Sequence, residues 1–152
     1  MGENVYVKIP ITNTARQPPR EQIRRLVHSG VKVNVAGDPG VGTGARRAEA
    51  LARGAPSVVS VFAGRMADTG VDPALIMAEA VRLISPHPGI ELWASPRELL
   101  NTFQANDVGC HIITATDSVL SKLKVVGKEL CDYSLGTVRM FYNDAAHSGY
   151  QL

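Results

Sequence analysis

With 152 residues, the chain has the length of one domain, so we expect a single domain over residues 1–152. Hydrophobic residues make up 45% of it, which is enough for a sizeable core. The formal net charge of +2 lacks the basic excess of a nucleic-acid-binding domain, and we expect no nucleic-acid partner. No apolar run reaches the length of a membrane span and no secretory signal begins the chain, which favours a cytoplasmic protein without a membrane partner.

Cysteine and histidine residues give no sign of a disulfide framework or a metal centre. Two cysteines, Cys110 and Cys131, are too few for a framework and fit a reducing compartment. No histidine pairs with Cys, Asp or Glu at metal-ligand spacing. We therefore predict no metal site and no cofactor.

The first predicted strand, residues 5–11, carries a lysine at its centre. Strict alternation places Val7 and Ile9 on one face and Tyr6, Lys8 and Pro10 on the other. Burial of Lys8 would favour the neutral amine, which is a nucleophile. The alternative is an edge-strand lysine whose ammonium reaches water, because lysine commonly protects exposed strand edges.

Strands and helices then alternate along the chain. The further predicted strands are 31–35, 58–62, 90–94 and 111–114. The predicted helices are 20–29, 45–52, 72–83, one that begins at residue 95, 117–123 and 135–146. This order is typical of an α/β fold with a parallel sheet, either an open doubly wound sheet or part of a (β/α)8 barrel. An intact barrel needs roughly 250 residues.

Polar side chains stand at the C-terminal ends of these strands, where parallel α/β folds place their ligands. They are Lys8, Asn34, Ser60 with Arg65, and Ser95 with Arg97.

The segments that carry these side chains resemble the transaldolase family. They are Val5-Tyr-Val-Lys-Ile-Pro-Ile-Thr12, Val31-Lys-Val-Asn-Val35, Ser60-Val-Phe-Ala-Gly-Arg65 and Trp93-Ala-Ser-Pro-Arg97. In order and separation they are similar to the fourth to seventh strands of that family's TIM (β/α)8 barrel, and residues 111–114 are similar to the eighth. The resemblance covers nearly the whole chain and implies a partial barrel made of strands 4–8.

The resemblance implies a role for each residue of the site. Lys8 matches the Schiff-base lysine, and Asn34 matches the asparagine that helps hold the bound intermediate. Ser60 and Ser95 match serines of the pocket. Phe62 stands where transaldolases carry phenylalanine and the related fructose-6-phosphate aldolases carry tyrosine, which favours transfer over simple aldol cleavage.

Arg65 and Arg97 match two arginines that grip the phosphate of the sugar, which charge-assisted hydrogen bonds make possible. We also expect Ser95 to cap a helix and to place Arg97 in its first turn, where amide donors favour an anion. Without the resemblance, Ser95 would be a plain cap and the two arginines solvated surface residues. The implied activity is transfer of a dihydroxyacetone unit between ketose and aldose phosphates, as in the pentose phosphate pathway.

The chain also departs from the family. The first three strands, with the acidic residues that serve in proton transfer, have no counterpart here, so we expect a C-terminal fragment that does not complete catalysis alone. Five strands leave two unpaired edges, which a second copy of the chain could cover in a homo-oligomer. Ala36 replaces the family's usual threonine, which helps position a catalytic water. Residues 37–46 are rich in Gly, Ala, Arg and Pro, which indicates either a reading-frame slip or a genuine loop replacement.

The same stretch resembles a P-loop, because a strand precedes its glycines and a helix follows them. Thr43 stands in place of the phosphate-binding lysine, and Gly44 in place of the magnesium-binding hydroxyl residue. Three hypotheses follow. They are a transaldolase-type enzyme, an inactive barrel fragment that retains a sugar-phosphate-binding surface, and a degenerate P-loop nucleotide-binding protein.

Overall fold

The computed structural model describes residues 2–37 and 44–149, with residues 44–47 described by their backbone alone. The chain forms two compact units, Met1–Leu120 and Ser121–Leu152. The first unit holds all five strands of the sheet and every residue that the sequence singles out for the site.

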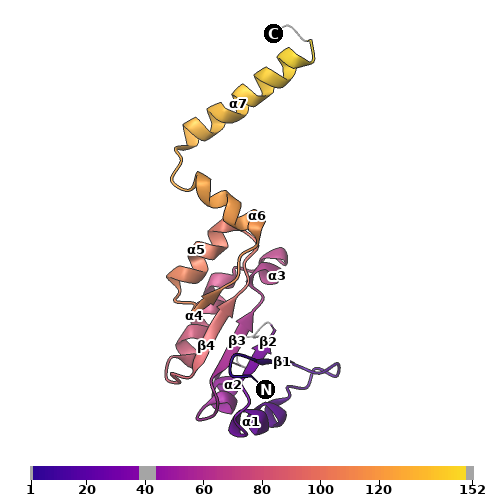
Figure 1. The fold of residues 1–152 in the computed structure, drawn as a ribbon, viewed down its shortest axis with the longest axis vertical. Coiled ribbons are helices and arrows are strands. Elements are labelled where there is room, and N and C mark those ends of the chain that lie inside the picture. Colours follow the sequence, from indigo (N-terminus) through magenta and orange to yellow (C-terminus); the bar gives the residue numbers. More distant parts are fainter. Residues whose placement is uncertain (1, 38–43, 150–152) are drawn as a thin grey trace. The chain divides into compact units, whose positions relative to one another are not determined.

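One five-stranded sheet forms the centre of the first unit, and each strand pairs with its neighbours in parallel (Figure 1). The strands are β1 (Val7–Pro10), β2 (Val33–Ala36), β3 (Ser57–Val61), β4 (Ile90–Ala94) and β5 (Ile112–Ile113). Their order in space is their order in the chain, so β1 and β5 form the two edges. A doubly wound sheet would reverse this order at a switch point, whereas a (β/α)8 barrel keeps it. The predicted parallel α/β fold is confirmed, and the strand order agrees with part of a barrel.

Helices follow the strands, as the sequence predicts. In the first unit they are α1 (Arg20–His28), α2 (Gly44–Leu51), α3 (Ala63–Asp68), α4 (Pro73–Ile84), α5 (Leu99–Asp107) and α6 (Asp117–Leu120). The sequence pattern did not predict α3, a helix of 6 residues directly after β3. None of the described helices combines the length and the apolarity that crossing a bilayer requires.

The helices cover one face of the sheet, which we call the core face. Val35, Val59 and Leu92 lie on it and are buried. They belong to one hydrophobic cluster with Val27 of α1 and Met77 of α4. Valine predominates in β2 and β3, which suits this position, because β-branched side chains pack well on a pleated and buried surface.

Helix α5 begins later than the sequence indicates. Its first residue is Leu99, and Glu98 is the N-cap with an extended backbone. The prediction that Ser95 caps this helix and that Arg97 lies in its first turn is therefore wrong.

Ser95 continues the ladder of β4 instead. Its N–H donates to the carbonyl of Val61 over 3.3 Å, and its own carbonyl accepts from the N–H of Gly64 over 3.0 Å. Pro96 explains this conformation, because the residue before a proline is disfavoured in the helical region. The end of β4 is thereby tied to the first turn of α3.

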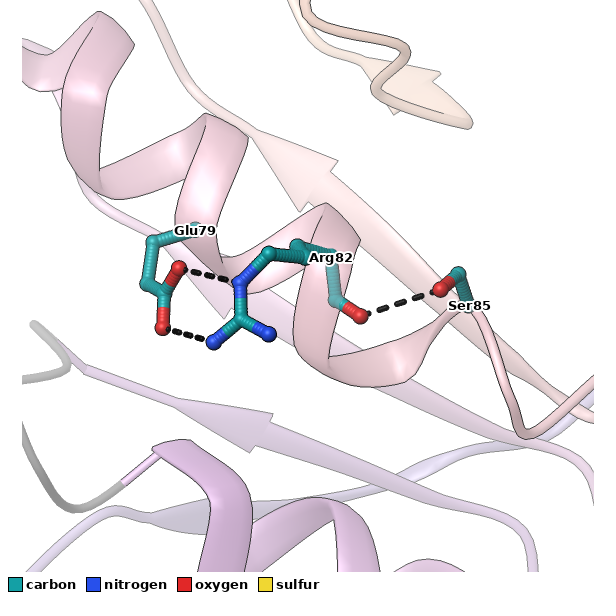
Figure 2. Close-up of polar contacts among 3 residues, drawn as sticks. All are labelled: Glu79, Arg82 and Ser85. Atoms are coloured by element: carbon teal, nitrogen blue, oxygen red, sulfur yellow. Dashed lines mark hydrogen bonds and ion pairs between the residues drawn. The ribbon is translucent and has the colours of Figure 1, made fainter.

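Helix α4 shows how the outer surface of this unit is built. Asp72 caps it by accepting from the N–H of Ala74 over 2.9 Å. On the solvent side, Glu79 accepts two hydrogen bonds from Arg82, of 2.7 and 2.6 Å, and Ser85 donates to the Arg82 carbonyl over 3.0 Å (Figure 2). The hydrogen bond from Arg82 lowers the pKa of Glu79 below its ordinary value.

The second unit contains the 3-10 helix η1 (Ser121–Val125) and helix α7 (Leu130–His147). Glu129 caps α7 by accepting from the N–H of Cys131 over 2.9 Å, so the helix begins five residues before the predicted residue 135. Many large apolar side chains of α7 are exposed: Leu130, Tyr133, Leu135, Val138, Met140, Phe141 and Tyr142.

Candidate active site

The face of the sheet opposite the core face carries the lysine and the polar residues, and we call it the lysine face. The strand register runs across it in two rows. One row pairs Lys8 with Asn34, Asn34 with Val58 and Val58 with Glu91. The next row, nearer the C-terminal ends of the strands, pairs Ala36 with Ser60, Ser60 with Trp93 and Trp93 with Ile112.

Asn34 and Ser60 form a buried polar pair in the middle of this face. The Ser60 hydroxyl donates to the Asn34 amide oxygen over 2.6 Å, and the two residues are only 5% and 7% exposed. This bond fixes which end of the Asn34 amide faces Ser60. Two polar side chains that the sequence places on separate strands are therefore in direct contact.

Lys8 lies on the edge strand β1 and is exposed, which is the alternative that the sequence left open beside burial. Its Nζ is 5.6 Å from the centre of the Phe62 ring. The guanidinium carbon of Arg65, from α3, lies 4.7 Å from the centre of the same ring. Phe62 thus brings the two cations together at the C-terminal end of β3, where each gains a cation–π contact.

Arg97 approaches from the segment between β4 and α5 and pairs with Asp68 at the end of α3. Its side chain crosses Gly64, where an added Cβ would lie 2.4 Å from the Arg97 Cγ. Only a residue without a Cβ fits beneath the arginine in this arrangement. Both members of the ion pair are more than half exposed, so a ligand anion can compete for the guanidinium.

Three residues of this region were not singled out from the sequence. Asp68 was missed because α3 was not predicted. Glu91 and Trp93 were missed although the alternation of β4 predicts them on the same face as Ser95. The alternation was visible in the sequence, but the aliphatic residues on either side of Trp93 drew attention away from it.

Metal, thiol and nucleotide chemistry each concern a different part of the chain. Within the described residues, no group of three or more His, Cys, Asp or Glu is arranged to hold a metal ion. Burial raises the pKa of the Cys110 thiol to about 11, which leaves it a poor nucleophile near neutral pH. The P-loop prediction falls mainly on residues 38–43, which lie outside the described residues.

A parallel sheet whose spatial order follows the chain order is typical of a barrel-type α/β fold, and such folds carry their polar side chains toward the C-terminal ends of the strands. Residues 1–149 match the sequence profile of the transaldolase/fructose-6-phosphate aldolase family. The chain belongs to this family, as the motifs around Lys8 predict.

Curated relatives agree with this assignment. The chain is 32% identical over 126 residues to a probable transaldolase of Methanococcus maripaludis strain C7. It is 31% identical to the probable transaldolase of strain C5 and 30% identical to that of Methanococcus vannielii, again over 126 residues. Each alignment covers 81% of this chain and 54% of the relative, so the chain spans about half the length of the relatives it matches.

Proposed function

We propose that the chain binds a ketose phosphate on the lysine face and forms a Schiff base with it through Lys8, as part of a transaldolase-type transfer in carbohydrate metabolism. The observation that carries this proposal is the position of Lys8 beside the buried Asn34–Ser60 pair in the strand register. The relatives' printed name, probable transaldolase, supports the reaction class.

The chemistry requires an amine beside polar groups that can hold the sugar. The Lys8 nitrogen attacks the ketone carbon and water leaves, which forms an iminium. The iminium accepts the electron pair of the carbon–carbon bond that breaks while the neighbouring hydroxyl loses its proton to solvent, so an aldose phosphate departs and the dihydroxyacetone unit stays on Lys8 as an enamine. The enamine carbon then attacks the carbonyl carbon of a second aldose phosphate, whose oxygen takes up a proton. Water hydrolyses the resulting iminium, which releases the new ketose phosphate and frees the lysine amine. In this proposal, Asn34 and Ser60 hydrogen-bond the hydroxyls of the bound unit, which their polar groups on the lysine face support.

Arg65 and Arg97 are the proposed phosphate ligands. Arg65 shares the Phe62 ring with Lys8, which keeps the guanidinium near the amine. Arg97 lies across the first turn of α3, the same helix that carries Arg65. A phosphate held here would replace Asp68 at Arg97 with a bidentate partner. Ser95 stands directly before this arginine segment and completes the proposed pocket.

A second candidate function is a sugar-phosphate-binding surface without covalent chemistry. The exposure of Lys8 favours it, because an enzyme that uses a lysine nucleophile usually shields the amine from water. None of the proposed site residues is a carboxylate that could move the protons of the transfer cycle. The two candidates share the arginines and differ at Lys8.

Borohydride trapping separates these candidates. The chain is incubated with fructose 6-phosphate, reduced, and weighed by intact mass spectrometry. We expect one covalent adduct in the wild type and none in Lys8→Ala. Lys32→Ala is the matched control, because the Lys32 Nζ lies 5.7 Å from the Tyr6 ring and donates to the Glu3 carbonyl, outside the Asn34–Ser60 pair. An adduct that survives Lys8→Ala, or phosphate binding without any adduct, would reject the Schiff base.

A further inference from the structure

We infer that Trp93 is a specificity-determining residue of the sugar site, whose indole face contacts the carbon skeleton of the bound sugar phosphate. The inference rests on the proposed function and deepens it, because it names the part of the ligand that the site recognises besides the phosphate. Neither the family assignment nor the relatives' names assign a role to this residue.

The strand register places Trp93 next to the polar pair. Trp93 is the Cα partner of Ser60, and parallel strands lie about 4.8 Å apart, so the two side chains leave the same face of the sheet as neighbours. Ser60 in turn donates to Asn34, which is the Cα partner of Lys8. From the β1 edge inward, the lysine face therefore presents an amine, a polar pair and an aromatic ring.

Thr114 holds the indole in one orientation. The Trp93 Nε1–H donates to the Thr114 hydroxyl over 2.6 Å, from β4 to the segment just after β5. Indole has a single N–H donor, and this bond occupies it. What Trp93 can offer a ligand is therefore its ring surface, not a hydrogen bond.

A ring surface selects a different part of the ligand from the arginines. Arg65 and Arg97 suit a phosphate, and the Asn34–Ser60 pair suits hydroxyls, whereas an indole face packs against C–H groups and excludes water. Because Trp93 is partly buried and is the register partner of Ser60, a sugar bound to the polar pair would lie next to the indole ring. The ligand class that matches all three surfaces is an open-chain sugar phosphate.

The composition of the chain makes this contact directly measurable. Trp93 is its one tryptophan, so fluorescence excited at the indole reports on this position alone. We expect fructose 6-phosphate to change the emission in a saturable way, and inorganic phosphate, which lacks a carbon skeleton, to leave it unchanged. Calorimetry on the same samples gives the Kd of each ligand without relying on Trp93.

Variants separate a contact from a structural role. Trp93→Ala should raise the Kd for fructose 6-phosphate about tenfold and leave the Kd for inorganic phosphate unchanged. Trp93→Phe keeps a ring and should lose less affinity, and it serves if the alanine variant unfolds. Thr114→Val releases the indole and should weaken the fluorescence response with a smaller change in Kd. A purely structural role would raise both Kd values together.

Combining these readouts with borohydride trapping keeps the two proposals apart. One outcome would overturn the inference and leave the Schiff base standing. It is trapping at Lys8, tryptophan fluorescence of the wild type that fructose 6-phosphate does not change, and a Kd for fructose 6-phosphate that Trp93→Ala does not change. A saturable fluorescence change without an adduct would support the contact at Trp93 and reject the covalent step. If fructose 6-phosphate does not bind at all, both fail.

Discussion

At the scale of single residues, the buried hydrogen bond from Ser60 to Asn34 is the contact that orders the lysine face. Replacing Ser60 by alanine leaves the Asn34 amide oxygen without its donor in a buried place. We expect Ser60→Ala to lower the free energy of unfolding by about 1–3 kcal/mol and to reduce the yield of the trapped adduct. Chemical denaturation and intact mass measure the two effects.

Ser57 provides the matched control on the same strand. It is 1% exposed, lies on the core face, and its hydroxyl donates to the Ala55 carbonyl over 2.9 Å. Ser57→Ala should lower the free energy of unfolding, but under conditions where the variant is folded it should not lower the yield of the trapped adduct. Equal losses of adduct in both variants would show that Ser60 acts only through stability.

Asp68 pairs with Arg97 and would compete with a ligand anion for its guanidinium. An exposed ion pair of this kind contributes about 0.2–1 kcal/mol, so Asp68→Asn should tighten binding of inorganic phosphate by up to about fivefold. Calorimetry at low ionic strength checks it. Glu79→Gln removes a similar ion pair on the outer face of α4 and should leave phosphate binding unchanged. Weaker binding in Asp68→Asn would mean that Asp68 positions the guanidinium rather than competing with the ligand.

The residue pattern predicted part of this site. Alternation placed Lys8 on the face opposite the aliphatic residues of its strand, and in the structure Asn34 is its register partner on the neighbouring strand. The contact between Asn34 and Ser60 was not predictable from pattern, because it depends on the pairing register of two strands. The exposure of Lys8 follows from its edge position, which the sequence does not specify.

At the scale of elements, the junction between α3 and the end of β4 sets the position of both arginines. Gly64 donates to the Ser95 carbonyl, and Arg97 crosses it. We expect Gly64→Ala to displace Arg97 and to weaken the binding of inorganic phosphate, because an added Cβ would overlap the arginine stem. Calorimetry measures the binding, and circular dichroism checks that the sheet persists.

Gly136 in α7 is the control for the same substitution. Nothing lies within 4 Å of an added Cβ there, so Gly136→Ala should stabilise the helix by about 0.5–1 kcal/mol and leave phosphate binding alone. Unchanged binding in Gly64→Ala would contradict the role assigned to this junction.

The same junction marks the limit of element prediction. The strand–helix alternation, and with it the parallel sheet, followed from hydrophobic periodicity. Helix α3 was not predicted, because 6 residues are too few to show a helical period. The start of α5 was misplaced because the capping-box spacing of residues 95–98 competes with Pro96, which favours an extended residue before it.

At the scale of the whole molecule, the exposed apolar side chains favour self-association. Seven large apolar residues of α7 are exposed, and the edge strands β1 and β5 each have one neighbour in the described sheet. A surface of this kind usually marks an interface. We propose that the chain is a homo-oligomer, and expect sedimentation velocity to show species larger than a monomer at micromolar concentration.

Charged substitutions on α7 test where that association arises. Leu135→Glu and Phe141→Glu place carboxylates on the exposed apolar surface and should shift the distribution toward monomer. Asn143→Glu, at an exposed polar position of the same helix, carries the same added charge and should have little effect. A monomer at every concentration in the wild type would contradict the proposal.

Lys8 is the residue that we propose bonds covalently to a ketose phosphate, and peptide mapping of the reduced adduct identifies the modified residue itself. The wild-type chain is treated with fructose 6-phosphate and borohydride, digested, and sequenced by mass spectrometry. We expect the added mass on the peptide that contains Lys8, at the nitrogen of that residue. Adduct on another lysine, or spread evenly over the lysines of the chain, would contradict it.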